Sequence, residues 1–256
     1  MRIAHISDLH IIATAEAPGV VRPDAVSRAR ALIADLSGFP DLDLVVITGD
    51  NVNDARPEEY AVLAGVLAEL TVPYVILPGN HDDRTHLRAL AHDRPYSDPD
   101  LLYHVWQQGH ARVIVLDTLW PGEIGGRLLP AQLDWLSTQL AQPFDGQTLI
   151  ALHHPPCAPA MGRLDGNTLV EGATALRALL DGQPHPVTLL CGHMHRPFAA
   201  LFGRSFVSAV TSTAFQFALA LDAPDEPPAV AEPYHYNIHV LGADRSHVIH
   251  RCFVAL

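Results

Sequence analysis

The segment Leu77-Pro78-Gly79-Asn80-His81-Asp82 follows an apolar run and brings an amide, an imidazole and a carboxylate together after a tight turn. Four more polar clusters each follow an apolar run in the same way: Asp8-Leu9-His10, Gly49-Asp50, His153-His154 and Gly192-His193-Met194-His195. Their donors are carboxylate, amide and imidazole groups with no cysteine among them, a set that suits two adjacent divalent metals. Five such clusters are difficult to explain by chance, so the sequence predicts a dinuclear metal centre.

Strand-like and helical patterns alternate along most of the chain. Strands are expected at six apolar runs: Ile3–Ile6, Leu44–Ile47, Tyr74–Leu77, Val113–Leu116, Thr148–Leu152 and Val187–Leu190. Helices are expected over residues 23–36, 57–70, 132–140 and 173–180. This alternation is typical of parallel strands joined by crossover helices.

The polar clusters lie at the carboxyl ends of the expected strands, which is where open α/β sheets place their sites. Seven side chains able to bind metal meet there: Asp8, His10, Asp50, Asn80, His153, His193 and His195. Seven ligands suffice for two metals if one carboxylate bridges them. Asp50 is the expected bridge because it is the only acid of its cluster, whereas Asn80 is a weak neutral ligand that would leave its metal open to substrate.

The spacing within two clusters suggests how their side chains are aimed. Asp8 and His10 are two residues apart, and so are His193 and His195. On an extended segment, residues two apart point to the same side. We therefore expect each pair to reach the metal centre from an extended stretch of backbone.

The pattern changes after Ser205. The runs Phe206–Ala209, Tyr236–Leu241 and Val248–Val254 follow one another without intervening helices, which suggests a second, antiparallel sheet. We expect one layered α/β domain over residues 1–256, with a β-rich part from about residue 205 onward and a sheet-on-sheet core flanked by helices.

Composition restricts the function. The 256 residues carry a formal net charge of −12, which argues against a protein that coats nucleic acid, because phosphate backbones require clustered positive charge. All 16 basic residues are arginine, so lysine nucleophiles and Schiff bases are excluded. No apolar stretch is long enough for a transmembrane helix and no signal peptide is evident. The scattered Cys157, Cys191 and Cys252 suggest reduced thiols, and we expect a cytoplasmic location.

In order and spacing, the five clusters resemble those of the calcineurin-like metallophosphoesterase family, over residues 8 to 195. Further stretches resemble the bacterial class III cyclic-nucleotide phosphodiesterase and glycerophosphodiesterase branch: Gly49-Asp50-Asn51-Val52-Asn53, Arg56-Pro57-Glu58-Glu59-Tyr60 and His153-His154-Pro155-Pro156. The resemblance implies a four-layer αββα sandwich of two mixed sheets flanked by helices. It also implies two divalent ions (Fe, Mn, Zn or Co) and hydrolysis of a small phosphodiester by a hydroxide that they activate.

The resemblance also assigns roles to the residues. Asp8, His10, Asp50 and His195 would hold one metal, and Asp50, Asn80, His153 and His193 the other. His81 would approach the phosphate or the leaving group, so that Asp50 and His81 form the catalytic pair. His10, Asn80, His81 and His195 would border the substrate. Related proteins often form dimers or larger homo-oligomers, which we expect here too.

Several roles remain open. His154 could support the site rather than bind metal, and Asn53 and Arg56 could touch substrate. Asp82 could orient His81 or cap the following helix, and capping is preferred. Substrate choice is expected to depend on the loops over residues 96–109 and 121–130 and on the segment after Phe215.

Three functional interpretations compete. The leading one is a metal-dependent phosphodiesterase acting on a 3′,5′-cyclic nucleotide or a glycerophosphodiester. A phosphomonoesterase or a nuclease could use the same centre, although the acidic composition disfavours the nuclease. A scaffold that binds partners without catalysis is the third, and it is disfavoured because such scaffolds lose ligands and this chain keeps all of them.

Overall fold

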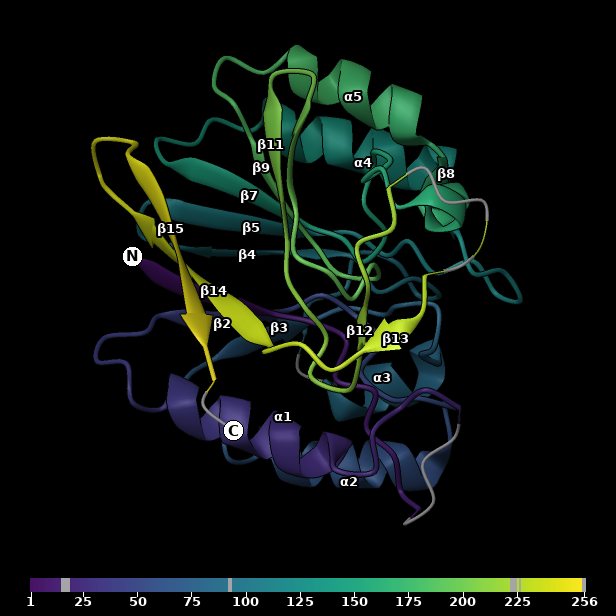
Figure 1. Cartoon of the computed structure of the whole chain (residues 1–256). Helices are drawn as coiled ribbons and strands as arrows, with labels where there is room; N and C mark the ends of the chain where they lie inside the picture. The colour runs from purple at the N-terminus through teal and green to yellow at the C-terminus, as the bar shows by residue number, and fades with distance from the viewer. Residues whose placement is uncertain (15–18, 92–93, 222–224, 226, 255–256) are drawn as a thin grey trace.

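The computed structural model describes the chain from residue 1 to 254, apart from residues 15–18, 92–93, 222–224 and 226. Two mixed sheets pack face to face, with one layer of helices outside each of them (Figure 1). The four-layer αββα sandwich expected from the sequence is therefore confirmed. No helix in these described stretches is long and apolar enough to cross a membrane.

The first sheet holds the N-terminal strands and the last two strands of the chain. Its order is β15 (His247–Phe253), β14 (His235–Leu241), β1 (Arg2–Ile6), β2 (Leu44–Ile47) and β3 (Tyr74–Ile76). Strands β1, β2 and β3 are parallel, while β14 runs antiparallel to β1, with Ile3 opposite His239. The N-terminal strand thus lies at the centre of this sheet, where it pairs on both edges.

The second sheet is built from the middle of the chain. Its order is β10 (Ala199–Phe202), β11 (Ser205–Ala209), β9 (Thr188–Cys191), β7 (Gln147–Ala151), β5 (Ala111–Val115) and β4 (His104–Gln108). The four inner strands are mutually parallel, and the two edge strands β4 and β10 are antiparallel to their neighbours.

The helices cover the outer faces of the two sheets. Helices α1 (Ala25–Leu36), α2 (Pro57–Leu67) and α3 (Arg84–Leu90) lie outside the first sheet, and α4 (Pro130–Ala141) and α5 (Ala173–Asp181) outside the second (Figure 1). Short connections complete the fold: a 3₁₀ helix (Gly162–Asn167), the pair β6 (Gly126–Arg127) and β8 (Leu169–Glu171), and the pair β12 (Gln216–Phe217) and β13 (Ala229–Val230).

The prediction of a second, antiparallel sheet after Ser205 is wrong. Strand β11 joins the second sheet in parallel with β9, and β14 and β15 extend the first sheet. The alternation of apolar and polar residues identifies these segments as strands, but pairing partners far away in the sequence decide which sheet each one joins. Whether the chain forms a single domain stays a prediction.

Apolar side chains fill each of the three spaces between the four layers. Leu32, Ile33 and Leu63 pack between the helices and the first sheet, while Leu136 and Leu176 pack against the second. Between the two sheets lies a third cluster that includes Ile3, Val46, Val113 and Leu190. This packing fixes the two sheets against each other, so the carboxyl ends of their parallel strands meet at one edge of the molecule.

Candidate metal centre

The structure brings all seven predicted ligands together at that edge. Asp8 and His10 follow β1, Asp50 follows β2, Asn80 follows β3, His153 follows β7, and His193 and His195 follow β9. Residues almost 190 positions apart thereby become neighbours, since Asp8 Oδ1 lies 3.3 Å from His195 Nε2. The side chains form two groups that share one carboxylate.

The first group contains Asp8, His10, Asp50 and His195, whose ligand atoms all lie within 4.8 Å of one another. The Nε2 atoms of His10 and His195 are 3.1 Å apart. Asp50 Oδ2 lies 3.6 Å from His10 Nε2. All four residues are buried, so water cannot readily separate them.

The second group is centred on His153. Its Nε2 atom lies 3.1 Å from His193 Nδ1, 3.2 Å from Asn80 Oδ1 and 3.3 Å from Asp50 Oδ2. Because Asp50 Oδ2 faces both groups, this carboxylate is placed as a bridge would be. The other oxygen, Oδ1, accepts a hydrogen bond from the backbone N–H of His81 at 2.9 Å.

Hydrogen bonds behind the imidazoles decide which ring nitrogen is available. His153 Nδ1 lies 2.7 Å from Thr48 O, and His195 Nδ1 lies 3.1 Å from Phe215 O. His10 Nδ1 lies 3.2 Å from Asn53 Oδ1. A carbonyl or amide oxygen can only accept, so each Nδ1 carries a proton and each Nε2 can present a lone pair to the centre.

This donor set fits divalent cations. Lone pairs on imidazole nitrogens, carboxylate oxygens and an amide oxygen converge at 3.1 to 3.6 Å, which is unfavourable unless a positive charge lies between them. Nitrogen and oxygen donors of this kind serve Zn, Mn, Fe and Co, and no thiolate is present to select a softer ion. The residues therefore match the two metals that the sequence predicts.

Protonation states agree with such a centre. Burial lowers the pKa of His10 and of His193 to about 3, so both imidazoles are neutral. Burial alone would raise the pKa of Asp50, but the imidazole of His153 holds it well below the usual value. Burial also works against a charge on His153, yet Asp50 raises its pKa to about 9. A bound metal would therefore displace a proton from His153.

Five of the predicted ligands have an unusual backbone conformation. Asp8, His10, Asp50, His193 and His195 have φ values of 54°, 42°, 49°, 71° and 50°. Such left-handed conformations are uncommon outside glycine and gather at functional sites. The prediction that the two spaced pairs reach the centre from extended backbone is wrong: both members of each pair reach it through sharp turns, and His193 and His195 belong to different groups.

Two glycines permit the close approach of these turns. A Cβ atom on Gly79 would collide with the backbone N and the carboxylate of Asp50. A Cβ atom on Gly192 would collide with Ser7 Oγ and the carboxylate of Asp8. Both positions therefore require a residue without a side chain.

His81 lies beside the centre. Its backbone N–H donates to Asp50 and its ring bonds to the carbonyl of Asn53. Its Nδ1 lies 2.7 Å from Asn53 O, so Nδ1 is the donor in this bond and Nε2 is not used by it. The ring meets His10 edge-on, with centroids 4.7 Å apart. Burial opposes a charge on His81, but the Asp50 carboxylate outweighs it and raises the pKa of His81 above the usual value.

Asn53 and Asp82 are the supports of this site. Asn53 orients His10 through its side chain and His81 through its carbonyl. Asp82 Oδ2 accepts hydrogen bonds from the N–H groups of Gly79 at 2.9 Å and Asn51 at 3.1 Å, which joins the two ligand loops. The preferred prediction that Asp82 caps a helix is wrong, because Asp83 accepts the bond from His86 N and caps α3.

His154 lies close enough to His153 and His193 that ligand atoms of the three residues are all within 4.8 Å of one another, but its ring nitrogens have other partners. His154 Nδ1 lies 2.8 Å from Thr118 Oγ1 and its Nε2 lies 3.0 Å from Ile124 O, so both ring nitrogens are engaged. Although its ring is close to His193, His154 supports the loop that carries Ile124. Arg56 stands at the start of α2 and forms an ion pair with Asp54 at 3.3 Å.

A cavity of about 370 Å³ opens above the two groups. Besides site residues, its wall contains apolar side chains from several segments: Val20, Val21, Ile124, Leu164, Met194, Phe215 and Phe217. The loop 121–130 and the segment after Phe215 thus reach the cavity as expected, but residues 96–109 do not contribute to this wall. Among the described residues that line it, none is arginine.

Sequence reasoning did not identify most of this wall. Val20, Val21 and Leu164 belong to connections without a motif, and only the fold brings them to the metal groups. Met194 could have been found, because it lies inside the cluster that supplies His193 and His195.

The chain is similar to known phosphoesterases. A family model described as calcineurin-like phosphoesterase matches residues 1–197. The chain is 28% identical to a probable glycerophosphodiester phosphodiesterase GpdQ of Arcobacter nitrofigilis over 99% of this chain and 93% of that protein. It is 31% identical to the 3′,5′-cyclic adenosine monophosphate phosphodiesterase CpdA of Escherichia coli, over 85% and 78%.

Two further similarities agree with these. A cAMP/cGMP dual specificity phosphodiesterase of Mycobacterium tuberculosis is 35% identical over 83% of this chain and 67% of that protein. Among solved structures, a dimetal phosphatase from Danio rerio superposes with a TM-score of 0.72 at 13% identity, covering 93% of this chain and 91% of that chain. The structural likeness concerns the fold.

Proposed function

Since the chain belongs to the calcineurin-like phosphoesterase family and is a phosphoric diester hydrolase, we propose that its substrate is a 3′,5′-cyclic nucleotide. Relatives of similar identity are named as cyclic-nucleotide or as glycerophosphodiester phosphodiesterases, so kinship alone does not separate these two diesters. The choice between the two diesters is proposed from the wall of the cavity above the metal groups.

We propose that the two groups each hold one divalent ion, Fe, Mn, Zn or Co. Asp8, His10, Asp50 and His195 would hold one ion, and Asp50, Asn80, His153 and His193 the other, with Asp50 as the bridge. When bound, the two ions supply a water of lowered pKa and neutralise charge on the phosphoryl oxygens. The buried carboxylates and imidazoles would hold the two ions in place for this chemistry.

The apolar, aromatic wall favours a nucleotide over a glycerophosphodiester. Phe215 and Phe217 lie at the edge of the metal groups, and the ring centroid of Phe215 is 4.0 Å from that of His195. An aromatic base gains area and favourable ring geometry on such a wall, which a glycerol group cannot match. A monoester dianion would in turn profit from a cationic side chain, and no arginine lines the described part of this cavity.

His81 is the proposed donor to the leaving oxygen. Its Nδ1 donates to Asn53 O, and the Asp50 carboxylate raises the pKa of His81, which favours the imidazolium form with a second proton on Nε2. An imidazolium in this place could donate a hydrogen bond, or its proton, to the ester oxygen that departs. His10, Asn80, His81 and His195 all line the cavity, which supports their proposed place beside the substrate.

We also propose a cytoplasmic location and assembly into homo-oligomers. Cys157, Cys191 and Cys252 are free thiols, which fits a reducing compartment. Size-exclusion chromatography with light scattering tests the assembly.

The test of the function is hydrolysis by metal-stripped protein that has been reconstituted with manganese. The panel contains an activated diester, an activated monoester, 3′,5′-cyclic AMP and glycerophosphoethanolamine. We expect turnover of diesters that requires metal, with cyclic AMP preferred over glycerophosphoethanolamine. Asn80→Ala should lower kcat by about 100-fold or more, because it removes a ligand of one proposed metal.

The matched control is Asn167→Ala, which changes the same side-chain type on the cavity wall away from the two metal groups. It should retain both metals and most of kcat, although it can change KM. Preference for the monoester would contradict the proposal, and equal rates for cyclic AMP and glycerophosphoethanolamine would remove the role of the aromatic wall.

A further inference from the structure

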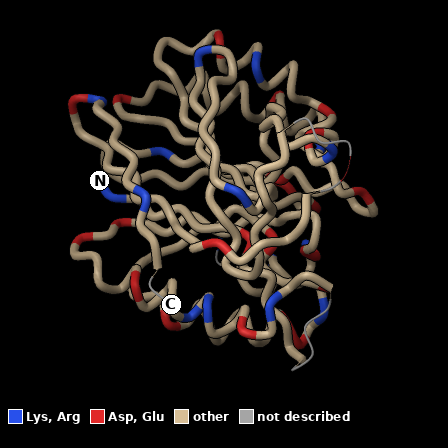
Figure 2. Tube along the Cα trace, in the orientation of Figure 1, with Lys and Arg blue, Asp and Glu red and all other residues tan. Residues whose placement is uncertain are grey.

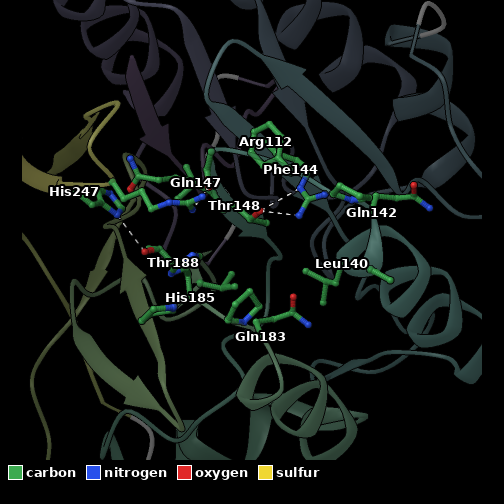
Figure 3. A pocket seen from close by; sticks show the side chains of 18 residues that line it. Arg112, Leu140, Gln142, Phe144, Gln147, Thr148, Gln183, His185, Thr188 and His247 are labelled. Atoms are coloured by element: carbon green, nitrogen blue, oxygen red, sulfur yellow. Dashed lines mark hydrogen bonds between the residues drawn. The ribbon is translucent and has the colours of Figure 1, made fainter.

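A second cavity, of about 520 Å³, lies at the opposite end of the second sheet from the metal groups. Its lining includes Arg112, Gln147 and Thr188, which stand at the amino ends of β5, β7 and β9. Figure 3 shows Arg112 and Thr148 on one side of the space and Gln183 and His185 on the other. Its volume is within the range of pockets that hold small organic ligands.

The charge of this lining differs from that of the whole chain. Arg112, Arg245, His185 and His247 line the cavity, and no Asp or Glu does so among the described residues. The chain as a whole has a formal net charge of −12, with acidic and basic residues interspersed along the trace in Figure 2. Asp145, an exposed carboxylate outside the lining, pairs with Arg245 at 3.2 Å.

Arg112 is a buried cation in the wall of this cavity. Its residue is only 7% exposed, yet no carboxylate in the described ranges of the chain forms an ion pair with it. Its guanidinium donates to Thr148 Oγ1 at 2.9 and 3.1 Å and to Gln139 O at 3.0 Å, which uses three of five N–H groups. Burying a cation without an anion is costly, so an anion in the adjoining cavity would be favourable.

The remaining wall is suited to a flat apolar group. Phe144 lies under the guanidinium of Arg112, with 4.8 Å between the central carbon and the ring centroid. Leu140, Pro184 and Pro186 continue the lining beside it. An arginine fixed at the edge of an aromatic and proline-rich wall is the combination expected around a ligand that has one anionic group and one planar group.

We propose that this cavity is a second binding site for a small organic phosphate with a planar ring, of the size of a nucleoside monophosphate. Arg112 holds the phosphate, and Phe144 with the neighbouring prolines holds the ring. The site is separate from the metal groups, and the proposal does not depend on the substrate proposed for them.

Hydrogen exchange of the metal-loaded full-length protein tests the proposal, because it locates binding along the chain. AMP is the probe, with inorganic phosphate and adenosine as its two halves. We expect AMP at millimolar concentration to slow exchange in residues 140–148 and 183–188, and each half alone to do so less. Arg112→Gln should weaken this protection by about tenfold in apparent Kd, since a charge-assisted contact is lost.

Phe144→Leu provides a second variant, because it leaves the hydrogen bonds of Arg112 in place and should weaken AMP but not phosphate. Arg177→Gln, which removes an exposed arginine on α5, is the control and should bind AMP as the natural sequence does. Both cavity variants should keep the hydrolytic activity. Unchanged exchange in the two segments, or equal AMP affinity in Arg112→Gln, would overturn the site. Equal protection by phosphate alone would overturn the role of the ring.

Discussion

Individual residues proposed as metal ligands are held in backbone conformations that they rarely adopt elsewhere. Each of the left-handed residues around Asp50 costs about 1–3 kcal/mol, and the converging lone pairs add electrostatic repulsion. Neighbouring residues maintain this arrangement. Asp82 accepts a hydrogen bond from the backbone of Gly79, and Gly79 and Gly192 leave room for the turns to approach each other. The chemistry of the site therefore depends on residues that never touch a metal.

Substitutions at the adjacent residues Asp82 and Asp83 test whether metal binding depends on these supporting hydrogen bonds. Asp82→Ala leaves the N–H groups of Gly79 and Asn51 without an acceptor, so we expect metal affinity to fall at least about tenfold and the free energy of unfolding by about 3 kcal/mol. Asp83→Ala removes only the cap of α3 and should cost about 1 kcal/mol, with metal affinity unchanged.

Metal titration by calorimetry and urea unfolding give the two quantities. If Asp82→Ala bound metal as tightly as the natural sequence, the hydrogen bonds of Asp82 to the two loops would not support the metal centre.

At the scale of the elements, helix α2 connects packing to the site. It begins at Pro57, and the carboxylate of Glu59 accepts hydrogen bonds from the N–H groups of Asp54 at 2.9 Å and Arg56 at 3.2 Å. These bonds hold the loop that carries Asn53, which in turn orients His10 and His81. The start of the helix is therefore part of the support of the active-site imidazoles.

Two glycines of different elements should respond oppositely to the same substitution. Gly65 lies on the exposed side of α2, where an added Cβ meets nothing within 4 Å, so Gly65→Ala should raise the free energy of unfolding by about 0.5–1 kcal/mol. Gly79→Ala forces a Cβ against Asp50 and should abolish metal binding and activity. Thermal unfolding and metal content distinguish the two, and a metal-loaded, active Gly79→Ala protein would show that the turn can move aside.

The sequence predicted all strands of the first sheet and the inner strands of the second, but it missed the two edge strands of the second sheet. Strand β2 is buried along its whole length and forms a continuous apolar run, so the predicted bounds Leu44–Ile47 match those of the structure. Edge strands β4 and β10 are partly exposed and have weak patterns, and they were not predicted.

The same limit applies to the site. Metal ligands were predicted because each is a short motif after a strand, and the structure brings all seven together, although their assignment as ligands stays a proposal. Thr48 orients His153 through its backbone carbonyl. Every residue has such a carbonyl, so this supporting role could not be predicted from the type of residue at position 48.

For the molecule as a whole, the space between the sheets is polar as well as apolar. His5 and His239 lie there fully buried, with His5 Nε2 3.0 Å from Thr48 Oγ1 and His239 Nδ1 2.9 Å from His247 Nε2. Burial lowers the pKa of His5 to about 3 and that of His239 well below its usual value. The folded protein keeps these imidazoles neutral while the unfolded chain would protonate them, so acid destabilises the sandwich.

His235 makes this effect testable at one position. Burial, with Arg251 nearby, lowers its pKa to about 4, against 6.5 in the unfolded chain. Above pH 6.5, His235 makes the free energy of unfolding neither rise nor fall with pH. As the pH falls from 6.5 to about 4, the imidazole becomes protonated in the unfolded state but stays neutral in the folded state, so the free energy of unfolding decreases. At pH 5 this costs about 2 kcal/mol, which His235→Leu should recover.

Urea unfolding of both proteins at pH 7 and pH 5 measures the change, with His250→Leu as a control at an exposed histidine of β15. Parallel pH dependence of the natural protein and His235→Leu would show that this imidazole is protonated equally in both states.

The left-handed turns around the metal centre also bear on how these positions respond to substitution. A glycine in place of Asp8 or Asp50 would relieve the backbone strain of the turn. It would also leave the backbone N–H of His193 or of His81 without its carboxylate acceptor and remove the partner of a buried imidazole. Backbone strain, buried pairing and chemistry therefore change together at each of these two positions.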